Sequence, residues 1–143
     1  MSKAQSHTTR SPEETEELGA SFSGGLSEGA SVGLIGDLGA GKTRFVRGMA
    51  QGLGSKGFVK SPSFIIINIY EGGRLPLYHI DLYRIGRAEE FYEAGLEEFI
   101  YGRGISVIEW ADKLPSLIRE CTHLVRFRYG KAEDERLIEI ERL

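Results

Sequence analysis

Gly36-Asp37-Leu38-Gly39-Ala40-Gly41-Lys42-Thr43 is the stretch that decides the expected fold of this chain. It matches G-x-x-x-x-G-K-[ST], a phosphate-binding loop that joins a buried strand to a helix. The short apolar run before it, residues 31–35, suits such a strand. Residues 42–53 suit the helix, because their apolar side chains recur on one helical face and Gly54 supplies a stop signal. The loop therefore stands in the context that the motif requires.

The residue types of the loop have a physical reason. Glycines let successive main-chain amides point inward at a β-phosphate, and the start of the following helix adds its positive dipole end. Lys42 is expected to place its charge on the β- and γ-phosphates, and the Thr43 hydroxyl to bind Mg²⁺. The chain contains no Asn-Lys-x-Asp sequence for reading guanine, so ATP is the expected nucleotide. The expected contacts with ATP are Gly36, Asp37, Leu38, Gly39, Ala40, Gly41, Lys42 and Thr43.

Magnesium usually takes a second protein ligand, such as a carboxylate at the end of a buried strand. Two residues qualify: Glu109 follows the apolar run 105–108, and Asp81 follows the run 77–80. The residue pattern does not decide which of the two is the second magnesium ligand.

The remaining segments predict an α/β fold. Ser11-Pro12-Glu13-Glu14 is a helix start. Further strands are expected at 64–70, 77–82 and 105–108, helical structure at 87–101 and a terminal hairpin after residue 124, where apolar and charged residues alternate. Residues 64–82 leave no room for a crossover helix, so the sheet should be mixed parallel and antiparallel. We expect a three-layer sandwich like those of P-loop nucleotide hydrolases, with residues 11–143 as one domain and residues 1–10 as a flexible N-terminus.

Composition narrows the possible environments and partners. No apolar stretch approaches the roughly 20 residues of a membrane span, so a cytoplasmic protein without membrane contact is expected. The net charge of −3 does not favour direct nucleic-acid binding, and ordinary surface charges are the favoured interpretation of Arg44, Arg47, Lys56 and Lys60. The single cysteine, Cys121, allows no internal disulfide and is expected to be a buried, inert thiol.

Four motifs together resemble the TsaE family, the bacterial ATPases of tRNA threonylcarbamoyladenosine biosynthesis. They are the phosphate loop, Ser61-Pro62-Ser63-Phe64, Tyr78-His79-Ile80-Asp81-Leu82-Tyr83-Arg84 and Val107-Ile108-Glu109-Trp110. The resemblance covers about residues 11–114. One departure is Ser63, where the family usually has threonine; the hydroxyl is kept, so a small effect is expected.

The resemblance implies a role in installing threonylcarbamoyl on the adenosine next to the anticodon, together with the proteins TsaD and TsaB. This subunit would supply magnesium-dependent ATP hydrolysis, while tRNA contact would be indirect. Because the loop contains no obvious strong base, we expect slow turnover alone and activation by partner contact. Thr43 and Glu109 would hold magnesium, Lys42 and Asp81 would be catalytic, and Thr15 would lie near the adenine. Residues 61–64 would form a switch-like loop near the γ-phosphate.

Alternatives remain at this stage. The chain could be a nucleotide-dependent assembly switch with little energy-coupled turnover, or a small-molecule kinase, although no arginine-rich lid is evident. His79 is expected to be a packed, hydrogen-bonded residue more than a proton-transfer group. Trp110 could cap the core or shape the nucleotide pocket, and Arg84 could act on phosphate or form an ion pair.

Overall fold

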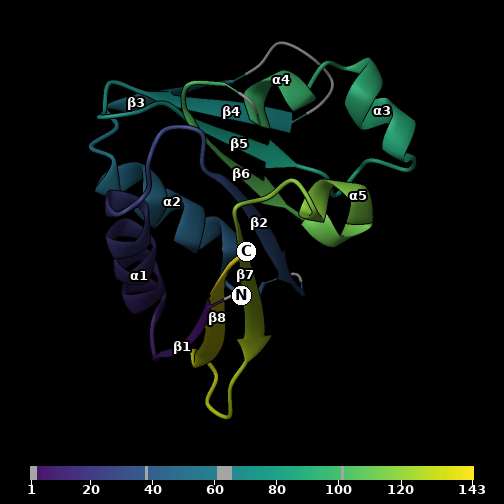
Figure 1. The fold of residues 1–143 in the computed structure, drawn as a ribbon. Coiled ribbons are helices and arrows are strands. Elements are labelled where there is room, and N and C mark those ends of the chain that lie inside the picture. The colour runs from purple at the N-terminus through teal and green to yellow at the C-terminus, as the bar shows by residue number, and fades with distance from the viewer. Residues whose placement is uncertain (1–2, 38, 61–65, 101) are drawn as a thin grey trace.

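A single eight-stranded sheet with helices on both faces forms the body of the protein (Figure 1). The computed structural model describes residues 3–37, 39–60, 66–100 and 102–143. In chain order its elements are β1 (Lys3–Thr9), α1 (Pro12–Gly24), β2 (Ser31–Gly36), α2 (Lys42–Gly52), β3 (Gly57–Lys60), β4 (Ile66–Glu71), β5 (Leu77–Asp81), α3 (Ala88–Glu93), α4 (Glu97–Ile100), β6 (Ile105–Glu109), the 3-10 helix η1 (Ala111–Lys113), α5 (Pro115–Ile118), β7 (His123–Tyr129) and β8 (Arg136–Arg142). Within these described ranges, no helix has the length and apolar character needed to traverse a membrane.

The strand order is β1-β8-β7-β2-β6-β5-β4-β3. β7, β2, β6 and β5 run parallel to one another in the centre, and the strands on either side pair antiparallel. The predicted mixed α/β sheet is therefore confirmed. Parallel central strands also bring the ends of β2, β5 and β6 to one edge, where the phosphate loop begins.

Two apolar cores lie on opposite faces of the sheet. α1 and α2 cover one face, where Phe45 and Met49 of α2 pack with Val107 of β6. The shorter helices α3, α4 and α5 cover the other face, where Phe91 packs with Ile108 of β6. Val107 and Ile108 divide between the two cores because successive side chains of a strand point to opposite faces.

Helices α1 and α2 approach each other through glycine. A Cβ atom added to Gly48 would lie 1.9 Å from the carbonyl oxygen of Glu16, and one added to Gly19 would lie 2.2 Å from that of Phe45. Such distances leave no room for a side chain, so these glycines set the helix spacing. The predicted start of α1 is also confirmed, since Ser11 Oγ accepts from the Glu14 amide at 3.1 Å.

The expectation that residues 1–10 form a flexible N-terminus is wrong for most of that segment. Lys3–Thr9 form β1, which pairs antiparallel with β8 along its whole length. The pairing uses main-chain groups and the side chains are mostly polar, so the segment has no apolar alternation to reveal a strand. At its end Thr9 is buried, and its Oγ1 lies 2.7 Å from Oγ1 of Thr15.

The other predicted elements occur close to their expected positions. The predicted strand at 64–70 corresponds to β4, although its first two residues and the proposed switch-like loop at 61–64 lie outside the described residues. The helical region from 87 is broken near Gly95 into α3 and α4. The predicted terminal hairpin is formed by β7 and β8, and across it Arg126 forms ion pairs with Glu139 at 3.2 Å and Glu141 at 2.8 Å.

Candidate nucleotide-binding site

The loop between β2 and α2 has the backbone shape that its glycines allow. Gly39 and Gly41 have φ angles of 80° and 103°, in the left-handed region that L side chains rarely adopt. Gly41 is the N-cap residue of α2, so the unpaired amides of the first helical turn begin immediately after it. Amides and helix dipole at this point favour an anion. Leu38 lies outside the described residues.

A cavity of about 340 Å³ lies beside this loop. It brings together Lys42 and Thr43 of α2, Asp81 of β5 and Glu109 of β6, four residues singled out from the sequence. The further lining residues are Gly39, Gly41, Arg44, Tyr83 and Trp110. The cavity is thus at the carboxyl ends of parallel strands, where open α/β sheets bind ligands.

Among the described loop residues, Gly36, Asp37 and Ala40 do not line this cavity. Ala40 is fully buried beneath the loop, Asp37 is exposed, and Gly36 presents its carbonyl oxygen to the Lys42 ammonium group. Their expected contacts with ATP stay predictions.

Lys42 is held at the floor of the cavity. The residue is 4% exposed, its Nζ donates to the carbonyl oxygen of Gly36, and Nζ lies 3.4 Å from the centroid of the Trp110 ring. Burial lowers the pKa of Lys42, an effect opposed by the nearby carboxylates, of which Glu109 acts most strongly. A phosphate would therefore meet an ammonium group that has already lost most of its water.

Thr43 and Glu109 form the candidate magnesium ligands. Thr43 Oγ1 lies 3.5 Å from Oε1 of Glu109, and Glu109 is 5% exposed. Asp81 is directly opposite Glu109 in the register of β5 and β6, and its Oδ1 accepts from the Tyr83 amide at 2.9 Å. A hydroxyl and a carboxylate oxygen suit Mg²⁺, which normally keeps several waters and takes phosphate oxygens as further ligands. The contact with Thr43 makes Glu109 the candidate second protein ligand.

His79 is packed and hydrogen-bonded, as the residue pattern favoured. Its side chain is buried, and its Nε2 lies 2.6 Å from Oε2 of Glu109. The two oxygens of Glu109 are therefore divided between His79 and Thr43.

Thr15 lies next to the loop but at a different cavity. This smaller cavity, of about 110 Å³, shares Gly39, Gly41 and Arg44 with the first one. Thr15 is almost fully buried there, with its hydroxyl engaged by Thr9. The placement is compatible with a position close to a bound nucleotide, and contact with adenine stays a prediction.

The terminal hairpin also reaches the phosphate loop, which the residue pattern did not indicate. Arg136 of β8 donates to the carbonyl oxygen of Gly39 at 3.3 Å, and its guanidinium lies 4.6 Å from the centroid of the Tyr129 ring. Arg136 and Asp134 both line the smaller cavity. Arg136 and Gly39 are 97 positions apart, so no local spacing in the sequence signals their contact.

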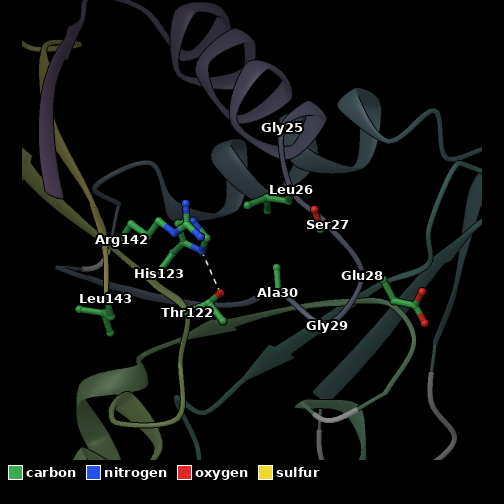
Figure 2. Close-up of a pocket in the computed structure, with 10 residues that line it drawn as sticks. All are labelled: Gly25, Leu26, Ser27, Glu28, Gly29, Ala30, Thr122, His123, Arg142 and Leu143. Carbon is green, nitrogen blue, oxygen red and sulfur yellow. Dashed lines mark hydrogen bonds between the residues drawn. The ribbon is translucent and has the colours of Figure 1, made fainter. Parts of the chain in front are cut away.

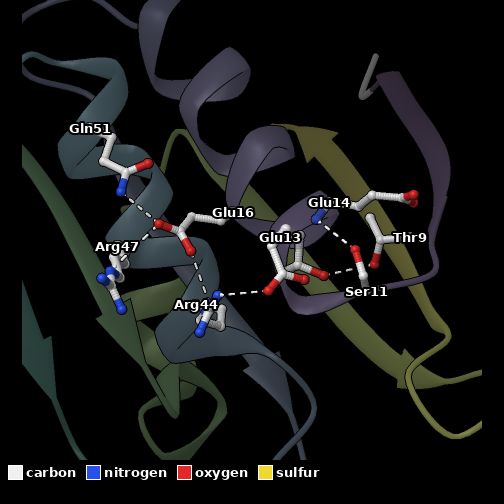
Figure 3. A network of polar contacts seen from close by, with 9 residues as sticks. Thr9, Ser11, Glu13, Glu14, Glu16, Arg44, Arg47 and Gln51 are labelled. Carbon is white, nitrogen blue, oxygen red and sulfur yellow. Dashed lines mark hydrogen bonds and ion pairs between the residues drawn. The ribbon is translucent and has the colours of Figure 1, made fainter.

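Arg44, which lines both cavities, is held by acidic residues of α1 (Figure 3). Its Nε lies 2.9 Å from Oε2 of Glu16, while Oε1 of Glu16 accepts from Gln51 at 2.6 Å and lies 3.5 Å from Nε of Arg47. Both arginines are therefore paired with Glu16, which agrees with ordinary surface charges rather than a basic patch.

A cavity of similar volume, about 340 Å³, lies at the opposite ends of the strands, between residues 25–30, Thr122, His123 and Arg142 (Figure 2). There Thr122 Oγ1 lies 2.8 Å from Nδ1 of His123. Burial, followed by the charge of Arg142, lowers the pKa of His123. A neutral imidazole and an exposed arginine do not make a phosphate cradle, so the loop cavity is the candidate site.

Comparison with known proteins tests the family resemblance. Residues 9–138 match the family model described as Threonylcarbamoyl adenosine biosynthesis protein TsaE. This chain belongs to the TsaE family. It is 42% identical over 120 residues to the tRNA threonylcarbamoyladenosine biosynthesis protein TsaE of Treponema pallidum, covering 84% of this chain and 88% of the relative. It is 42% identical over 128 residues to the protein of the same name from Bacillus subtilis, covering 89% and 80%.

A solved structure agrees with this family assignment. The crystal structure of Bacillus subtilis YdiB superposes with a TM-score of 0.74 at 34% identity, over 99% of this chain and 87% of that chain. The family resemblance and the expected fold class are both confirmed. The relatives carry the name of tRNA threonylcarbamoyladenosine biosynthesis, which is the role of the TsaE family.

Proposed function

We propose that this TsaE-family chain binds ATP with Mg²⁺ and hydrolyses it in support of threonylcarbamoyladenosine modification of tRNA next to the anticodon. The observation that carries the proposal is the convergence of Lys42, Thr43, Asp81 and Glu109 on one cavity beside a glycine loop. These residues come from α2, β5 and β6, and each has a type that phosphoryl transfer needs.

Binding follows from the loop and its lysine. The amides at the start of α2 and the Lys42 ammonium would contact the β- and γ-phosphates, replacing the interaction of Lys42 with Gly36. Thr43 and Glu109 would hold magnesium, which when bound neutralises charge on the phosphate oxygens. The buried Lys42 ammonium would exchange the neutral carbonyl oxygen of Gly36 for charged phosphate oxygens. Hydrogen bonds to charged groups are stronger, so this exchange favours nucleotide binding.

Hydrolysis requires a water molecule in line with the bond that breaks. The water oxygen forms a bond to the γ-phosphorus, the bond from that phosphorus to the β–γ bridging oxygen breaks, the water proton passes to a γ-phosphate oxygen or to solvent, and ADP and phosphate leave. Asp81 lines the cavity opposite Glu109 and would orient the water, while Lys42 stabilises the developing negative charge. Oδ1 of Asp81 accepts from the Tyr83 amide, which gives the carboxylate a defined direction.

Partner proteins complete the proposal. The family assignment supports action with TsaD and TsaB in the cytoplasm, and the net charge of −3 supports indirect contact with tRNA. We expect slow turnover by the isolated chain and faster turnover when the partners complete the site in trans.

The test is an ATPase assay of the chain with and without TsaD, TsaB and tRNA, in Mg²⁺ and after chelation. We expect activity that needs Mg²⁺, rises with the partners and is lost in Glu109→Gln but kept in Glu28→Gln, a control at an exposed site near the opposite cavity. Equal turnover of the two variants would refute the site.

A non-hydrolysable ATP analogue distinguishes energy coupling from an assembly switch. If the analogue supports one round of tRNA modification, nucleotide binding suffices and the switch is the correct function. If modification fails while the complex still assembles, hydrolysis itself is required.

A further inference from the structure

His79 is the buried polar residue next to the candidate metal ligand, and the proposed function assigns it no role. Its side chain is 8% exposed and that of Glu109 is 7% exposed. Nε2 of His79 lies 2.6 Å from Oε2 of Glu109. A carboxylate only accepts hydrogen bonds, so the Nε2 atom must be the donor.

The sheet register explains how these side chains meet. β5 and β6 are parallel, with His79 opposite Val107 and Asp81 opposite Glu109. Residues two apart on a strand share a face, so His79, Asp81 and Glu109 point to the same side of the sheet, the side covered by α1 and α2. His79 therefore reaches diagonally to Glu109 from beneath the nucleotide cavity.

We propose that His79 is a positioning residue that holds Oε2 of Glu109 so that Oε1 faces Thr43 and the magnesium site. The inference rests on the proposed function, because it concerns how that site takes its metal. With Oε2 engaged by His79, a single oxygen remains directed at Thr43 Oγ1, 3.5 Å away. Mg²⁺ demands near-ideal octahedral geometry, which one fixed carboxylate oxygen satisfies better than a freely rotating group.

The arrangement also determines which imidazole nitrogen carries the proton. Nδ1 of His79 is buried without a hydrogen-bond partner among residues 3–37, 39–60, 66–100 and 102–143. A buried N–H without an acceptor is costly, so the proton belongs on Nε2, where Glu109 accepts it. This tautomer keeps the imidazole a donor toward the metal ligand.

Two substitutions separate positioning from simple packing. His79→Leu fills a similar volume but removes the donor, whereas His79→Gln places an amide donor close to the position of Nε2. Loss of an outer partner of a metal ligand typically lowers metal affinity by about 10–100-fold. We expect that loss of Mg²⁺ affinity in the ATP complex of His79→Leu and recovery of most of it in His79→Gln, with His7→Leu on β1 as a remote histidine control.

Two measurements complete the test on the full chain. Calorimetric titration of Mg²⁺ into the ATP complex gives the affinity, with ATP binding in chelator measured beside it. Ring nitrogen NMR of the wild-type chain without metal or nucleotide should show the His79 proton on Nε2, and Glu109→Gln should change that signal. Wild-type Mg²⁺ affinity in His79→Leu, equal losses in the leucine and glutamine variants, or an unprotonated Nε2 would each overturn the inference.

These outcomes are distinguishable from failure of the proposed function. A wild-type chain that binds no Mg-ATP would refute the proposed function, and the NMR measurement would still decide whether His79 donates to Glu109. If His79→Leu does not fold, the glutamine variant and the wild-type NMR signal keep the inference open to refutation.

Discussion

The ammonium nitrogen of Lys42 lies 3.4 Å from the centroid of the Trp110 ring. This close cation–π contact is made by a residue whose own backbone is unusual, since Trp110 is the one non-glycine residue in the described part of the chain with a positive φ, at 61°. Trp110 directly follows Glu109 at the end of β6. The candidate metal ligand and the ring that contacts Lys42 are therefore neighbours in the chain.

Trp110 should report nucleotide binding by its fluorescence, because it is the only tryptophan in the chain. A bound phosphate would draw the Lys42 ammonium away from the Trp110 ring and so change the environment of the indole. We expect a saturable change in emission on adding Mg-ATP, absent in Lys42→Met and kept in Lys113→Met, whose ammonium lies over Tyr83 instead. Constant emission while calorimetry records saturation would contradict this assignment.

Removal of the Lys42 charge should weaken ATP binding strongly. Charge-assisted hydrogen bonds are worth about 1.5–3 kcal/mol, so Lys42→Ala should lower ATP affinity by about 10–100-fold. Lys56→Ala removes an exposed lysine and should change the ATP affinity little. Isothermal titration calorimetry of both variants decides, and similar affinities would remove Lys42 from the site.

The contact between the terminal hairpin and the phosphate loop should contribute less to ATP affinity than Lys42 does. Arg136→Ala removes one hydrogen bond to Gly39 and a stacking contact with Tyr129, so we expect ATP affinity to fall by about 3–10-fold. Arg128→Ala, an exposed arginine of the same hairpin, is the matched control. If the two variants bind ATP equally well, the hairpin contributes nothing to the nucleotide site.

Gly48 should tolerate no side chain. Gly48→Ala would force the added methyl group against the backbone of Glu16 and separate α1 from α2, at a cost of about 1–3 kcal/mol in the free energy of unfolding. Gly24→Ala is the control, because nothing lies within 4 Å of the added atom at the end of α1. Urea denaturation that ranks Gly24→Ala as the less stable protein would contradict this packing.

Cys121 should make stability depend on pH in the alkaline range. Burial raises the pKa of its thiol from 9.0 to about 11, so the folded chain retains a proton that the unfolded chain loses. The contribution of the protonated thiol to the free energy of unfolding is fully present below pH 9.0. It is lost as the pH rises to about 11, which lowers the free energy of unfolding by on the order of 2–3 kcal/mol.

Denaturation of wild-type and Cys121→Ala between pH 8 and 11 isolates this contribution, because other titrating groups are common to both chains. The wild-type stability should fall more steeply across that window. Parallel curves for the two chains would show that the thiol ionises equally in both states.

Much of the architecture was predictable from neighbouring residues. The phosphate loop, the helix after it and the hairpin each follow from patterns a few positions long, and Ser11 and Gly54 mark helix ends through local capping chemistry. β1 and β3 were missed because a polar or short edge strand carries little apolar alternation.

For the candidate site, too, the sequence identified the residues and the structure showed how they are arranged. The residue types of Lys42, Thr43, Asp81 and Glu109 identified chemistry at separate places along the chain, and the family resemblance proposed their roles. That Glu109 contacts Thr43 is seen only in the structure, because Asp81 and Glu109 follow similar strands and the sequence does not distinguish them.

The sequence by itself determined most of the elements, though not β1 or β3, and the phosphate-binding motif, because helix periodicity, strand alternation and glycine turns depend on residues close together in the chain. Only the tertiary structure decided that His79 holds Glu109, that Arg136 meets Gly39 and that α1 packs on the glycines of α2. These pairs are distant in sequence and meet through strand order and register, which arise from burying both faces of the whole sheet at once.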